Sequence, residues 1–113
     1  MNAYEIPGLR YSLPAGGDVA RHRFVSVNNK SEGVQATAST PVIGVSMNQT
    51  KAGEVLEIAD GIVMVVAAAA IEAGKGVVSD ANGKAVDAST NPAVGVAITG
   101  TTVADGLIAV KIK

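Results

Sequence analysis

One stretch of the sequence occurs twice and decides the fold class: ASTPVIGV at residues 38–45 is repeated as ASTNPAVGV at residues 88–96. Asn91 is the one inserted residue between the two copies. A valine- or isoleucine-rich run follows each copy, Val55–Ile58 after the first and Leu107–Val110 after the second. Two copies of a unit of about 50 residues predict a duplicated β structure, and they are too few for a solenoid.

Short β-prone runs fill the chain around this repeat. They alternate with Gly, Asn, Asp, Ser and Thr clusters at the spacing of strands in a β-sandwich or barrel. Asn82-Gly83 favours a tight hairpin turn, because both residues tolerate positive φ, and Asp60-Gly61 and Asp105-Gly106 predict further turns. We therefore expect an all-β fold, a small β-sandwich or barrel with an internal pseudo-repeat. The predicted strands are Arg21–Asn28, Gly33–Ala38, Val42–Met47, Glu54–Ala59, Gly61–Ala67, Gly76–Ser79, Lys84–Ala88, Ala93–Ile98 and Leu107–Ile112.

The first 15 residues differ from the rest of the chain. Pro7 and Pro14 oppose a regular helix and favour extended backbone. All three arginines and all three aromatic residues lie within the first 24 positions. We expect residues 1–15 to form an extended N-terminal arm outside the core, and residues 16–113 to form a single β domain.

Length and composition exclude several classes of protein. The chain has 113 residues, no cysteine and a net charge of −1, so it has no thiol chemistry and no global attraction to nucleic acid. Its longest apolar run, Ile62–Ile71, is shorter than the roughly 20 residues that a helix needs to cross a membrane. Only 3% of the residues are aromatic, so a core of small aliphatic side chains favours an oligomer or a protein docked on a larger body.

No group of residues points to catalysis, a metal or a cofactor. His22 is the only histidine, and a general base needs an orienting partner and a nucleophile that the sequence does not place near it. Glu54 and Glu57 point to opposite faces of a strand. The 13 glycines form no phosphate-binding loop. We therefore expect a non-enzymatic protein.

The N-terminal region carries the residue types that protein interfaces concentrate, arginine and tyrosine. Leu9, Tyr11 and Leu13 alternate, which suits a segment that lies along another β surface, and the alternative is a disordered terminus. At strand spacing Arg21 and Arg23 share one face. The predicted interface residues are Tyr4, Ile6, Leu9, Arg10, Tyr11, Arg21 and Arg23.

A series of turn-and-strand motifs resembles the head decoration proteins of tailed bacteriophages, also called capsid cement proteins. The resemblance covers residues 40–113, with a looser match over residues 12–39. Its motifs in chain order are Ala52-Gly53-Glu54-Val55, Gly61–Val65, Ile71–Gly74 followed by Val77-Val78, Asn82-Gly83-Lys84, Pro92–Val96 and Leu107–Val110.

The resemblance implies a non-enzymatic structural protein without a cofactor. It would bind the major capsid protein on the outer surface of the virion, after synthesis in the host cytoplasm, and would stabilise the assembled head. It implies a homo-oligomer, a trimer before a dimer, with neither nucleic acid nor a membrane as partner. The alternative is a head-fibre or tail-associated binding module, with carbohydrate as one candidate ligand, although sugar sites use exposed aromatic residues and none follows Phe24.

Overall fold

A computed structural model describes residues 5–38 and 40–113, and these ranges contain nine strands and no helix. The described residues therefore contain no helix long and apolar enough to cross a membrane. Every pairing between named strands is antiparallel, which confirms the all-β fold. The strands are β1 (Ile6–Pro14), β2 (Phe24–Val27), β3 (Gly33–Gln35), β4 (Gly44–Ser46), β5 (Val55–Val66), β6 (Gly76–Ser79), β7 (Ala85–Asp87), β8 (Gly95–Ala97) and β9 (Leu107–Ile112).

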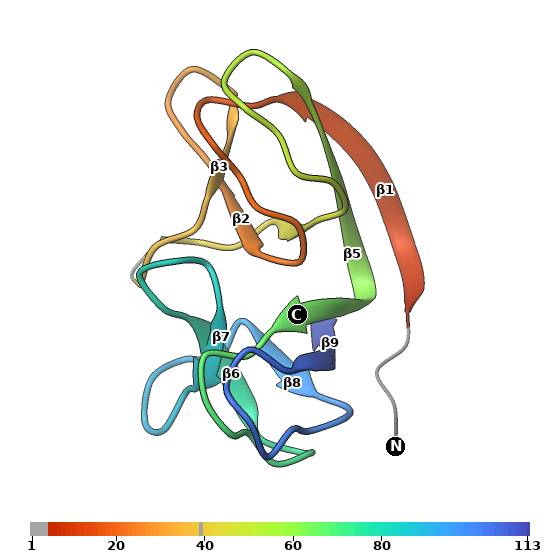
Figure 1. The fold of residues 1–113 in the computed structure, drawn as a ribbon, viewed down its shortest axis with the longest axis vertical. Helices are drawn as coiled ribbons and strands as arrows, with labels where there is room; N and C mark the ends of the chain where they lie inside the picture. The colour runs from red at the N-terminus through yellow and green to blue at the C-terminus, as the bar shows by residue number, and fades with distance from the viewer. Residues whose placement is uncertain (1–4, 39) are drawn as a thin grey trace.

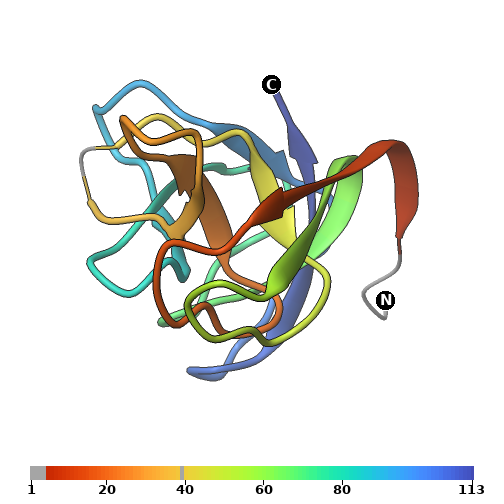
Figure 2. The same ribbon diagram turned by 90° about the horizontal axis from the view of Figure 1, so that it is seen from above.

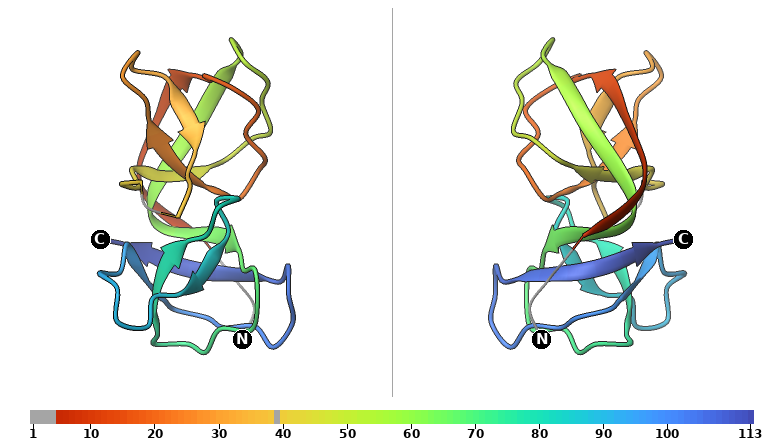
Figure 3. Two further views of the ribbon diagram at one scale, coloured as in Figure 1. Left: turned by 90° about the vertical axis from the view of Figure 1, so that its left-hand side faces the viewer. Right: turned by 90° about the vertical axis from the view of Figure 1, so that its right-hand side faces the viewer.

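The strands form a single curled sheet in two halves that share β5. The order is β3-β2-β4-β5-β9-β8-β6-β7, with β1 paired to β5 beside this path. The upper half contains β1 to β4 and the first part of β5, and the lower half contains the second part of β5 and β6 to β9. Figure 3 shows the two halves one above the other, and Figure 1 shows β5 running from the upper half into the lower half. In each half an isolated parallel bridge closes the curl, Ala15 to Gly33 above and Ala67 to Ala85 below. Of the two forms that the sequence left open, the sheet takes the barrel-like one.

The strand pairing confirms the duplication. Val25 pairs with Gln35 in the upper half, and Val77 pairs with Asp87 at the equivalent position of the lower half. In the upper half β1 pairs with the first part of β5, and in the lower half the second part of β5 pairs with β9 in the equivalent way. The repeated unit thus begins at β1 and begins again in the middle of β5.

The sequence repeat pairs Ala38 with Ala88, but the structure pairs Ala88 with a different residue. The Ala36 amide donates to the Phe24 carbonyl over 2.8 Å, and the Ala88 amide donates to the Gly76 carbonyl over 2.9 Å. Ala36 is therefore the structural equivalent of Ala88, and the first loop is the longer one.

Each half has its own apolar interior. In the upper half Leu56 and Ile58 are fully buried, and in the lower half Ile108 and Val110 occupy the equivalent positions. Phe24 also belongs to the lower cluster, and its amide donates to the Gly83 carbonyl over 2.8 Å. Ala36, Val45 and Ala59 belong to the same lower cluster, so the upper half packs onto the lower half through β2, β4 and β5 as well as the residue after β3.

The expected N-terminal arm is extended, as predicted, but its described residues do not all lie outside the core. Residues 6–14 are strand β1, which lies beside β5 in Figures 1 and 2. Tyr11 and Leu13 pack against the upper core, and Ala15 is a buried member of it.

Prolines are compatible with β1 because it is an edge strand. The Ala15 amide donates to the Glu54 carbonyl of the chain next to β1 over 2.8 Å. Backbone groups of successive residues point alternately to the two edges of a strand, so the backbone N–H and C=O groups of Tyr11 and Leu13 also point toward β5. The backbone nitrogen of Pro14 therefore points away from β5. A missing N–H there removes no bond of the sheet.

The turn expected at Asp60-Gly61 is also absent, because the two strands predicted on either side of it are one strand, β5. Gly61 lies in its middle with a φ of 97°, and β5 bends sharply between the halves in Figure 1. A Cβ at Gly61 would overlap the Gly8 nitrogen of β1. Glycine thus allows the bend and the close approach of β1.

Replacement of Gly61 by alanine is expected to destabilise the protein by more than the roughly 1–2 kcal/mol of a left-handed backbone, because the new Cβ also displaces β1. Gly53→Ala is the matched control, since Gly53 has a φ of 87° and a Cβ added there would meet no atom within 4 Å. Thermal unfolding of both variants measures the difference. Equal losses of stability would show that the contact between β1 and β5 carries little energy.

Deletion of residues 1–15 is expected to lower the melting temperature strongly or to prevent folding, because it removes a whole strand and three side chains of the upper core. Leu13→Ala tests the same packing without removing the strand, at a cost of about 1–2 kcal/mol for a half-buried leucine. An unchanged melting temperature of the truncated chain would establish residues 16–113 as an independent domain.

Candidate interaction surface

β1 carries three of the predicted interface residues that are exposed in the structure, Ile6, Leu9 and Arg10. Ile6 is 61% exposed and Leu9 is 57% exposed. The pairing register of β1 shifts between Pro7 and Arg10, so Leu9 lies in an irregular segment of the strand. Arg10 is exposed as well, and Tyr4 lies outside the described residues. The surface of β1 thus presents two aliphatic side chains next to a cation.

Tyr11 points inward instead. Its hydroxyl donates a hydrogen bond of 2.9 Å to the Ile43 carbonyl, and its ring packs against the upper core. Burial raises the pKa of Tyr11, and the charge of Asp60 raises this pKa further. Tyr11 therefore holds β1 to the upper half.

Arg21, His22 and Arg23 precede β2 in a turn, so the prediction that the two arginines share a strand face is wrong. His22 has a φ of 61°, which reverses the chain direction between them. Arg21 is exposed, whereas the half-buried Arg23 donates from Nη1 to the Asn82 carbonyl of the lower half over 3.3 Å. Arg23 thus joins the two halves, whereas the side chain of Arg21 is exposed.

The backbone of His22 fixes the junction between the halves. Its amide donates to the Ser46 carbonyl, and its carbonyl accepts from the Val66 amide, each over 3.0 Å.

Burial lowers the pKa of His22, and the charge of Arg21 lowers it further, against opposing effects of Glu5 and of a hydrogen bond with the Met64 backbone. The imidazole is therefore neutral near pH 7.

A groove with a volume of about 540 Å³ lies between the two repeated loops. Its lining is hydroxyl, amide and aliphatic, without an ionisable side chain: Ala38, Thr40, Pro41, Val78, Ser79, Asn91, Pro92 and Val94. No cluster of three metal-ligating side chains occurs within the described ranges. This groove offers no acid–base chemistry.

Sequence reasoning missed one feature of this surface, the outward row of β5. Ile62, Met64 and Val66 are half-buried and alternate with the core residues Val63 and Val65. The signal is present in the sequence, but an unbroken apolar run does not show which residues face outward.

Comparison with known proteins identifies a structure with a similar fold and a matching family. The head fiber gp8.5 N base of bacteriophage phi29 has a similar structure, with a TM-score of 0.74 and 17% sequence identity over 93% of each chain, which establishes a shared fold. None of the curated proteins matches the sequence. The family model described as phage cement protein matches residues 5–112. Since that match spans nearly the whole chain, the protein belongs to the phage cement protein family and has a structural role associated with the phage capsid.

Proposed function

We propose that this chain binds the outer surface of an assembled phage head and stabilises it, with the major capsid protein as its partner. The observation that carries the proposal is the match of the cement protein family over residues 5–112. The protein acts as a structural component of the virion, without enzymatic activity, and is made in the host cytoplasm.

The exposed face of β1 supports attachment through the N-terminal region. Ile6 and Leu9 offer apolar contact area, and Arg10 offers a fork of donors that suits a carboxylate. Arg21 adds a second exposed guanidinium. Tyr4 stays a predicted contact of the same surface. Tyr11 and Arg23 make hydrogen bonds within the protein, so we propose that they stabilise the fold behind this surface.

A carbohydrate-binding fibre module is the alternative function. Sugar sites stack pyranose rings on exposed aromatic side chains. Phe24 is fully buried, and Tyr11 is half-buried with its hydroxyl bonded internally. The described aromatic residues therefore favour attachment to protein over attachment to sugar.

Purified protein mixed with phage heads that lack it is expected to bind in a fixed ratio and to raise the temperature at which the heads disrupt. Co-sedimentation measures the ratio, and the number of copies per attachment site tests the homo-oligomer that we propose, a trimer before a dimer. Binding to glycans without binding to heads would contradict the proposal, as would decorated heads that are no more stable than bare ones.

The double variant Arg10→Ala, Arg21→Ala is expected to bind heads more weakly at low salt, and its binding should depend less on salt than that of the unmodified protein. Charges at the rim of an interface contribute roughly 1 kcal/mol or less each, and they act mainly on the association rate. Head occupancy against salt concentration measures the effect, with Lys30→Ala, an exposed cation between β2 and β3, as the control.

Arg23→Ala is the internal comparison for this pair, and it should lower the melting temperature because Arg23 bonds to Asn82. If the double variant and the unmodified protein bind equally at every salt concentration, Arg10 and Arg21 do not contact the head.

A further inference from the structure

The duplication allows the outward surfaces of the two halves to be compared position by position. Tyr11 pairs with Ile58 in the upper half as Val63 pairs with Val110 in the lower half, so β1 corresponds to the second part of β5. The residues between the core positions face outward in both. They are Arg10, Ser12 and Pro14 in the upper half, and Ile62, Met64 and Val66 in the lower half.

Two neighbouring side chains extend the lower row into a patch. Ile6 lies opposite Ile62, and Leu107 lies opposite Val66 in the pairing register. Ile6 is 61% exposed and Leu107 is 41% exposed. We define the lower patch as Ile6, Ile62, Met64, Val66 and Leu107.

The fold itself does not require this patch to be apolar. The upper row has the same pairing and position in the repeated unit, and it carries a charge, a hydroxyl and a proline. Val55, the equivalent of Leu107, is the exposed aliphatic residue beside that row, so the two halves differ in the row itself. Ile62, Met64 and Val66 also belong to neither of the two core clusters. A contiguous apolar surface without a role in the core is typical of an interaction site.

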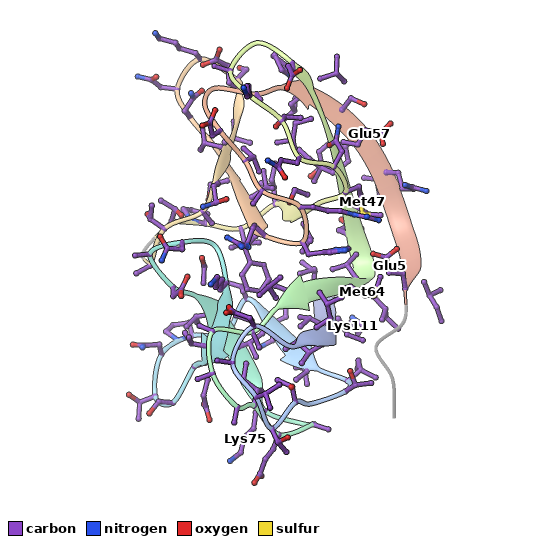
Figure 4. All side chains as sticks on the ribbon, viewed as in Figure 1. Glu5, Met47, Glu57, Met64, Lys75 and Lys111 are labelled. Carbon is purple, nitrogen blue, oxygen red and sulfur yellow. The ribbon has the colours of Figure 1, made fainter. Side chains whose placement is uncertain are left out.

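A lysine beside the patch indicates the charge of the partner. Lys111 is exposed and lies opposite Ile62 in the register. Figure 4 shows it on the same side of the molecule as Met64. The ion pair found within residues 5–38 and 40–113 joins Lys84 to Asp105, so Lys111 has no carboxylate partner there. An occupant with a carboxylate would provide one.

We propose that the lower patch and Lys111 form a second docking surface, which binds a segment of the capsid shell carrying aliphatic side chains and a carboxylate. The proposal rests on the proposed attachment to heads and names a contact beyond β1. A second copy of this chain is the alternative occupant, and the test below separates the two.

Met64→Ser tests the patch, because it places on the lower row the residue type that Ser12 supplies on the upper row. Val55→Ser is the matched control, because Val55 holds the upper-half position equivalent to Leu107 and is 63% exposed. Leu107→Ser is a second test at a more exposed site, in case Met64→Ser fails to fold. Thermal unfolding checks each variant, co-sedimentation measures its affinity for heads, and light scattering measures its size in solution.

We expect Met64→Ser and Leu107→Ser each to weaken head binding about tenfold or more, while Val55→Ser binds as the unmodified protein does. Lys111→Gln should weaken binding at low salt only. If the unmodified protein binds heads and both serine variants bind equally well, the patch proposal is wrong and the attachment stands. If the unmodified protein does not bind heads, the attachment itself fails. If either variant instead dissociates an oligomer in solution, the patch lies between copies of this chain and the proposal is overturned.

Discussion

The continuity of β5 through Gly61 is the constraint on which the rest of the structure depends. The strand ends the first repeated unit and begins the second, so neither half can curl without it. Its left-handed residue, with a φ of 97°, allows the bend between the halves and leaves room for β1 to cross at Gly8. The same strand therefore sets the position of β1 above and of β9 below, and it aligns their outward surfaces.

Much of this architecture was predictable from residue patterns, because the repeat and the turn residues act locally. β6 and β9 have the predicted bounds, and Gly83 takes the positive φ expected of Asn82-Gly83. The role of β1 was not predictable from its prolines alone, since a proline is excluded from a strand only where its nitrogen faces a neighbour. The alternation of Tyr11, Leu13 and Ala15, which matches Val63, Val65 and Ala67, was the available signal.

The candidate surface likewise contains residues whose exposure could be predicted from the sequence and residues whose contacts could not. Exposure of Ile6, Leu9 and Arg10 follows from their place on an edge strand, which sequence reasoning approached correctly as an extended segment. The different roles of Arg21 and Arg23 depend on the backbone reversal at His22, and the partner of Arg23 is 59 residues away in sequence. Such long-range contacts leave no periodic pattern, and they emerge only when the two halves are packed together.

The central claim is that the face built from β1, the second part of β5 and β9 lies against the capsid shell. An electron cryomicroscopy reconstruction of decorated heads, at a resolution that places individual strands, tests it most directly. The account predicts that Ile6, Met64 and Leu107 contact the shell, with Lys111 near a capsid carboxylate. A reconstruction in which this face points to solvent, and the repeated loops contact the shell instead, would contradict it.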